Sequence, residues 1–121
     1  MVAQPGLTVR WSLTESDPDV LDRLKVYVRD TSHARFTEMA GLRFKTWRAR
    51  AGEWFEGCYV FEDDAARDAF QTSFTAAAAD APGSQIIGSA PVLIEPCEIV
   101  AVAEGAGRFA ASPTYGPVGT Q

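Results

Sequence analysis

The sequence has few of the residues that most often build metal, nucleophile or haem sites. Its 121 residues include two cysteines, one histidine and no asparagine. A zinc site needs three or four converging ligands, and no spacing of Cys, His or carboxylate residues supplies them. The chain also lacks a phosphate loop, a dinucleotide fingerprint and a nucleophile elbow. We therefore expect no metal and no cofactor, while a flavin site without a sequence motif stays open.

Long apolar runs and an excess of basic charge are also missing. No apolar stretch approaches the ~20 residues that span a bilayer. The first residues have neither the basic nor the apolar region of a signal peptide. The formal net charge of −5 disfavours partners that require a basic surface, such as nucleic acid or an anionic membrane. These features predict a cytoplasmic protein that binds neither nucleic acid nor membrane.

The two cysteines, Cys58 and Cys97, are too few for a disulfide framework. We expect them on strands separated by a third strand, roughly 9–10 Å apart at two inter-strand spacings. A bridge within one chain needs Cα atoms within about 7 Å. Both are therefore interpreted as small, buried apolar residues.

The first half of the domain is predicted from periodicity. Residues 7–13 alternate strictly, which indicates a strand with Trp11 on its buried face. Apolar residues then recur at helical spacing from Val20 to Val28. We expect Asp17 to cap this helix, with Pro18 at its first position, and Asp30-Thr31-Ser32 as a candidate break.

The second half continues with strands from Leu42 to Arg50 and from Trp54 to Glu62. Asp63 or Asp64 then caps an alanine-rich helix that ends near Asp80. This helix carries one apolar stripe, formed by Ala66, Phe70, Phe74 and Ala77. A last strand is predicted from Pro91 to Ala103, at an edge or bulged at Pro96. The order strand–helix–strand–strand–helix–strand predicts an α+β, ferredoxin-like βαββαβ fold with a four-stranded antiparallel sheet.

The third and fourth strands are apolar on both faces, whereas a sheet with one wet face should alternate. No remaining segment is large enough to cover the second face. We therefore expect a homodimer in which a second copy closes a dimeric α/β barrel over residues 1–104. The tail, residues 105–121, is rich in Gly, Ala, Ser and Pro. We expect Phe109 and Tyr115 to pin it onto a partner subunit or over a pocket mouth.

One segment carries a recognisable pattern. Lys45 and Trp47 lie two residues apart just after Gly41, and a Gly57-x-Tyr59-x-Phe61 strand then leads into a helix. This pattern resembles the YdhR-like monooxygenases of the dimeric α/β-barrel (ferredoxin-like) superfamily, over roughly residues 7–103. The resemblance implies a cofactor-independent monooxygenase that acts on a small aromatic or polyketide-type compound. Haem-degrading members of the superfamily use an Asn–Trp–His set, which a chain without asparagine cannot supply.

Lys45 and Trp47 share a strand face, because side chains repeat every two residues. Trp47 would form the aromatic wall of a pocket, and Tyr59 would donate a hydrogen bond. Lys45 or Arg10 would stabilise a phenolate or enolate beside it. Cofactor-free oxygenases of the superfamily act on electron-rich phenols whose anion reacts directly with oxygen. The alternative is that the two aromatic residues only pack the barrel interior.

In that alternative, Lys45 and Arg10 pair with Glu56, Glu62 or Glu98. The substrate pocket is expected between sheet and helices, with a lining that includes Trp11, Phe44, Phe70 and Phe74.

A competing hypothesis is a non-redox cyclase or isomerase, with His33 or Glu98 as the base. His33 is otherwise a partly exposed loop residue, and Glu98 a charge that protects an edge strand from aggregation. A third hypothesis is a stress-related module that binds a small molecule without catalysis.

Overall fold

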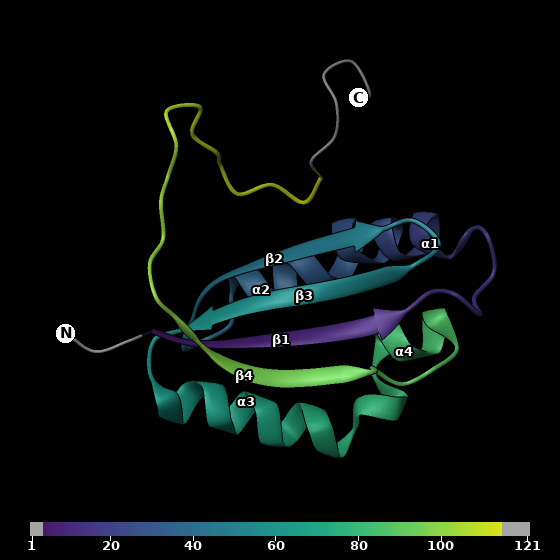
Figure 1. Cartoon of the computed structure of the whole chain (residues 1–121), viewed down its shortest axis with the longest axis horizontal. Helices are drawn as coiled ribbons and strands as arrows, with labels where there is room; N and C mark the ends of the chain where they lie inside the picture. The colour runs from purple at the N-terminus through teal and green to yellow at the C-terminus, as the bar shows by residue number, and fades with distance from the viewer. Residues whose placement is uncertain (1–3, 115–121) are drawn as a thin grey trace.

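A four-stranded antiparallel sheet carries the helices on one face in the computed structural model, which describes residues 4–114 (Figure 1). The strands are β1 (Gln4–Ser12), β2 (Leu42–Arg50), β3 (Trp54–Phe61) and β4 (Leu93–Ile99). They lie in the order β2-β3-β1-β4, and every neighbouring pair is antiparallel. The α+β class is as predicted and is consistent with a ferredoxin-like fold. The element order departs from the plain βαββαβ formula, because each crossover contains several helical segments.

The crossover from β1 to β2 is one continuous helical run. It comprises α1 (Val20–Tyr27), the π-helical segment η1 (Val28–Ser32) and α2 (His33–Thr37). The predicted break at Asp30-Thr31-Ser32 is therefore wrong, since these residues belong to a widened helical turn. Such π-helical turns are frequent at functional sites. The predicted cap is also wrong, because the helix begins at Val20 with Asp19 at its N-cap.

The crossover from β3 to β4 contains α3 (Asp64–Ala76), the 3₁₀ turn η2 (Ala78–Asp80) and α4 (Pro82–Ile87). The Asp63 carboxylate caps α3, as predicted, by accepting a hydrogen bond from the Ala66 amide at 2.8 Å. Helix α4 was not predicted. Pro82 begins this helix, because the first helical turn tolerates proline.

Strand β4 is shorter than the predicted Pro91–Ala103. Its last residue, Ile99, pairs with Gln4 at the start of β1, so the pairing ends there. The strand lies at the sheet edge, as Pro96 predicts. Residues 100–114 then run away from the sheet without forming a helix or strand (Figure 1). Phe109 is 67% exposed, and the prediction for Tyr115 falls outside the described residues.

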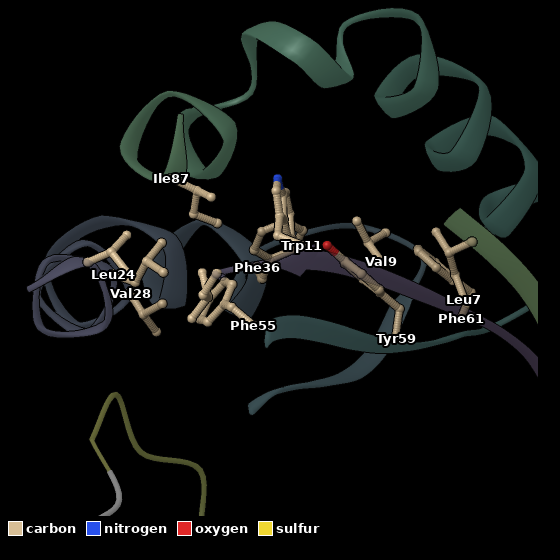
Figure 2. Close-up of a cluster of buried hydrophobic side chains, with 12 residues drawn as sticks. Leu7, Val9, Trp11, Leu24, Val28, Phe36, Phe55, Tyr59, Phe61 and Ile87 are labelled. Carbon is tan, nitrogen blue, oxygen red and sulfur yellow. The ribbon is translucent and has the colours of Figure 1, made fainter. Parts of the chain in front are cut away.

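The core lies between the sheet and the helices (Figure 2). Alternate residues of β1 and β3 form its floor, and α1, α2 and α4 add buried side chains from above. The largest contributors are Leu7, Val9, Trp11, Leu24, Phe36, Phe55, Tyr59 and Phe61. The Trp11 indole N–H donates a hydrogen bond to Ser84 Oγ at 2.9 Å, and this hydroxyl donates to the Ala78 carbonyl at 2.6 Å. These bonds tie β1 to α4 and η2.

The two cysteines are unpaired and lie on β3 and β4, with β1 between them, as predicted. Cys58 is half-buried, but Cys97 is exposed because it stands on the edge strand. The expectation that both are buried is therefore wrong for Cys97. No helix within residues 4–114 is both long enough and apolar enough to cross a membrane.

Candidate functional site

A cavity of about 320 Å³ lies between the sheet and the helical layer. Strands β1, β2 and β3 form its floor, while η1, α2, α3 and the start of α4 form its walls. Most of its lining is aromatic, from Trp11, Tyr27, Phe36, Trp47, Phe55, Tyr59, Phe70 and Phe74. A cavity of this size with convergent polar groups is a typical small-molecule site.

The Lys45 amine is one of the polar groups in this cavity, and aromatic rings surround it. Its Nζ lies 3.4 Å from the ring centroid of Phe36, 4.5 Å from that of Trp47 and 4.4 Å from that of Tyr59. Within residues 4–114, no carboxylate forms an ion pair with it. The predicted alternative, in which Lys45 pairs with a glutamate, is therefore wrong.

Burial in this aromatic surrounding lowers the pKa of Lys45 well below its ordinary value, and the nearby positive charge of Arg35 adds to the effect. Desolvation disfavours the charged form of an amine, so the neutral form is populated at lower pH than in water. A neutral amine can act as a base or a nucleophile, which an ammonium group cannot do.

Tyr59 supplies a hydrogen-bond donor beside the amine. Its side chain points from β3 toward the helices (Figure 2). Burial raises the pKa of the Tyr59 phenol well above its usual value, so the hydroxyl keeps its proton. Within the described part of the chain, the Tyr59 hydroxyl forms no hydrogen bond with another protein group. It is therefore free to donate to a ligand.

Gly57 leaves the space that Lys45 and Tyr59 share. A Cβ at this position would lie 3.0 Å from Lys45 Cε and 3.3 Å from the Tyr59 hydroxyl oxygen. Its backbone does not require the left-handed conformation, which the structure assigns to Gly41, Gly52 and Gly88. The glycine is therefore needed for room rather than for backbone freedom.

A Gly57→Ala substitution should weaken binding of a cavity ligand about tenfold or more, because the added methyl group displaces the Lys45 and Tyr59 side chains that pack over Gly57. The free energy of unfolding should fall by about 1–3 kcal/mol, because the Lys45 side chain can shift but the buried Tyr59 ring, whose Cε1 would lie 3.2 Å from the new Cβ, is crowded. Calorimetric titration alongside thermal unfolding would test both. Gly105→Ala is the matched control, because a Cβ there meets nothing within 4 Å. Unchanged ligand affinity in Gly57→Ala would contradict the assignment.

His33 lies beside the site rather than in its wall. It begins α2, so the interpretation as a loop residue is wrong. Its ring centroid lies 5.9 Å from that of Trp47, and the side chain is half-buried. The cavity lining does not include it. His33 can reach a ligand only where the ligand extends past Trp47.

Two predicted site residues lie on the opposite face of the sheet. Val9 and Trp11 both face the helices. Arg10 lies between them in the strand, so its side chain points to the other face of the sheet. Its Nε donates to Glu56 Oε1 at 3.0 Å. Phe44 adjoins Lys45 in β2 and is 40% exposed on that same far face. Neither lines the cavity, so both assignments are wrong.

Of the remaining predicted site residues, three line the cavity and Glu98 does not. Trp11, Phe70 and Phe74 line the cavity, as expected from the apolar faces of β1 and α3. Glu98 is exposed on the edge strand β4, so it is not a buried base. Within residues 4–114, no cluster of three or more His, Cys, Asp or Glu residues is placed to hold a metal ion.

Sequence reasoning missed Phe36 and Arg35 as parts of the site. Phe36 covers the Lys45 amine most closely, and Arg35 lines the cavity beside it. A four-residue spacing could have placed Phe36 on the buried face of this helical run. The buried residues at this spacing are Leu24, Val28, Ser32 and Phe36. That period is longer than the 3.6 residues of an α-helix and fits a run that widens into a π-helical turn.

No family model matches the chain, and no curated protein matches it. Among solved structures, the NE2512 protein of unknown function from Nitrosomonas europaea superposes with a TM-score of 0.61 at 24% sequence identity. That match covers 87% of this chain and 97% of the other. Rv0793 from Mycobacterium tuberculosis gives a TM-score of 0.46 at 13% identity, covering 85% of this chain and 99% of the other. The likeness to NE2512 shows the α+β fold, and the relation to YdhR-like proteins stays a resemblance.

Proposed function

We propose that this protein is a cofactor-independent monooxygenase that acts on a small, electron-rich phenol or polyketide-type aromatic compound. The observation that carries the proposal is the Lys45 amine, which lies in an aromatic cavity without a carboxylate partner among residues 4–114. The Tyr59 hydroxyl stands beside it. A phenol whose ring lies along Trp47 would direct its oxygen toward both groups.

The first step is a proton transfer. The phenol gives its O–H proton to the neutral Lys45 amine, so a phenolate and an ammonium form as a pair. The lowered pKa of Lys45 suits this role, because a general base is most efficient near the working pH. The ammonium and the Tyr59 hydroxyl then stabilise the charge on the phenolate oxygen. The aromatic walls exclude water, which strengthens both interactions.

The second step is the reaction with oxygen. An electron-rich ring carbon that carries a hydrogen, ortho or para to the phenolate oxygen, forms a C–O bond to O₂, and the resulting peroxide takes up a proton. Loss of the proton on that carbon and cleavage of the O–O bond then release hydroxide, which leaves as water after protonation. One oxygen atom enters the quinone product and the other leaves in water. The substrate supplies all four electrons, so no external reductant is needed.

Oxygen consumption with a panel of hydroquinones and anthrones tests the proposal. We expect saturable uptake with one O₂ consumed per quinone formed, and loss of about 100-fold or more of the rate in Lys45→Met, typical for removal of a general base. Lys25→Met is the matched control, because Lys25 is the only other lysine and is exposed on α1. If compounds bind but oxygen consumption stays at the background rate, the oxygenase proposal is refuted, and a protein that binds small molecules without this catalysis remains.

A non-redox cyclase or isomerase is the second candidate, and the contact between His33 and Trp47 is the observation that favours it. Such an enzyme would convert its substrate without oxygen, with His33 as the base. Turnover under nitrogen that His33→Ala abolishes would support it. Full anaerobic turnover by His33→Ala would remove this residue from the mechanism.

We also propose that the protein forms a homodimer through the far face of the sheet. Phe44 and Leu93 are 40% and 37% exposed there. Val100, Val102 and Phe109 are 86%, 70% and 67% exposed on the segment that leaves β4. Burial of these side chains by a second copy would remove apolar surface from water. Sedimentation at micromolar concentration should give the mass of a dimer, and a monomer would refute the proposal.

A further inference from the structure

We infer that Lys45 captures an aromatic or conjugated aldehyde or ketone as a Schiff base, an activity that uses the same cavity but requires no oxygen. It goes beyond the oxygenase proposed above, since it forms a covalent bond between protein and ligand. A lysine acts in this way when its amine is unpaired, shielded from water and reachable by a carbonyl carbon.

The surroundings of the amine meet these conditions. Three aromatic rings lie within 4.5 Å of Nζ, and the cavity of about 320 Å³ opens beside it. The largest effect of a neighbouring charge is that of Arg35, which opposes protonation of the amine. Carboxylates usually hold a lysine in its charged form, and none pairs with this amine within the described chain.

The geometry over Gly57 brings an acid to the same place. A Cβ of residue 57 would lie 3.0 Å from Lys45 Cε and 3.3 Å from the Tyr59 hydroxyl oxygen, so both side chains pack over Gly57 and lie close together. A carbonyl group in the cavity beside these two side chains can have its carbon near the amine and its oxygen near a hydroxyl donor. Because the Tyr59 hydroxyl keeps its proton, it can donate to the carbonyl oxygen.

The reaction balances without an oxidant or reductant. The nitrogen lone pair forms a bond to the carbonyl carbon while the π electrons move to oxygen, which accepts a hydrogen bond from the Tyr59 hydroxyl. A proton then moves from nitrogen to this oxygen, and the carbinolamine hydroxyl leaves as water after protonation while the nitrogen lone pair forms the C=N bond. The products are an imine and one water molecule. The aromatic lining favours a carbonyl attached to a ring, since flat rings pack against the Trp47 and Phe36 side chains.

Reductive trapping tests the inference on the unaltered chain. The protein is incubated under nitrogen at pH 7 with 4-methoxybenzaldehyde and cyanoborohydride, and labelled peptides are quantified by mass spectrometry. The chain has two lysines, so Lys25, exposed on α1, is an internal control. We expect Lys45 to be labelled at least about tenfold faster than Lys25, because a larger share of its amine is neutral. Equal or slower labelling of Lys45 would overturn the inference.

A Tyr59→Phe variant tests the role of the hydroxyl. Labelling of Lys45 should slow about tenfold while that of Lys25 stays the same, and unchanged labelling of Lys45 would remove Tyr59 from the reaction. Trapping and oxygen uptake can fail independently. If Lys45 is trapped but no oxygen is consumed, the Schiff-base inference stands and the oxygenase proposal is refuted. If oxygen is consumed but Lys45 is not labelled faster than Lys25, the oxygenase proposal stands and the Schiff-base inference is refuted.

Discussion

Replacing Lys45 by methionine should raise the free energy of unfolding by about 1–2 kcal/mol at pH 7, even though it removes the proposed base and nucleophile. Methionine has nearly the same length and volume as lysine and no group to desolvate. The faces of three aromatic rings attract the Lys45 ammonium, but without a carboxylate partner in the described chain its desolvation should cost more free energy than these contacts return. A residue that lowers stability in this way is typical of a functional site.

The pH dependence gives this prediction its sharpest test. The pKa of Lys45 is lowered in the folded chain, whereas the unfolded chain keeps the ordinary value. Between these two pKa values the unfolded state binds more protons, so the stability of the wild type rises as pH rises. Lys45→Met should lack this component. The difference in stability between variant and wild type should therefore shrink as pH approaches the ordinary pKa of lysine.

Denaturant unfolding at several pH values between 6 and 10 measures both effects. Lys25→Met is the control, since Lys25 is exposed on α1 and its loss should change stability by less than about 0.5 kcal/mol. A Lys45→Met protein that is less stable than the wild type at every pH would show that the amine holds the aromatic rings together. In that case the cost of burying Lys45 could not be used as an argument for function.

The alternation of side chains made most of the sheet predictable. In β1, Leu7, Val9 and Trp11 repeat every second residue, and one buried face makes that period visible in the sequence. The same rule, applied to β2, would have separated Phe44 from Lys45, because adjacent residues of a strand point to opposite faces. Phe44 therefore belongs to the far face, and the strand period alone is enough to predict this.

The helical segments were harder to predict from the sequence, because their geometry depends on tertiary packing rather than on local helix propensity. Asp30, Thr31 and Ser32 have weak helix propensity, which favours a break. The burial of Ser32 and Phe36 against the sheet holds the run helical through η1. Helix α4 likewise depends on contacts that are distant in sequence, since Ser84 is held by the Trp11 indole of β1. Neither outcome follows from a local pattern.

Arg10→Met should destabilise the protein by about 2–4 kcal/mol at pH 7, because it leaves a buried carboxylate with fewer partners. Glu56 is 1% exposed, although it lies on the face of the sheet away from the helices. Arg10 Nε donates to it at 3.0 Å and Arg48 Nη2 at 3.2 Å. Arg10 also lies over the Trp54 ring at 4.2 Å, so methionine loses this packing as well.

The pH dependence provides a second test, because the wild type should lose more stability on acidification than Arg10→Met does. Burial opposes ionisation of Glu56, yet the hydrogen bond from Arg10, aided by Cys58 and Arg48, holds its pKa below the ordinary value. A carboxyl group with a lowered pKa stabilises the folded state above its unfolded pKa, and the contribution disappears as pH falls through the folded pKa. Without Arg10 the pKa of Glu56 rises, so this pH-dependent component is smaller in the variant, and the difference in stability between wild type and Arg10→Met should shrink as pH falls.

Arg48→Met is the matched control, because its side chain is 61% exposed and its contact with Glu56 is longer. We expect it to cost less than about 1 kcal/mol, as for an ion pair that solvent screens. The double variant Arg10→Met, Glu56→Leu should recover much of the lost stability, since replacing both partners leaves no buried charge. Equal losses in Arg10→Met and Arg48→Met, or no recovery in the double variant, would mean that Glu56 is held by the sheet itself rather than by Arg10.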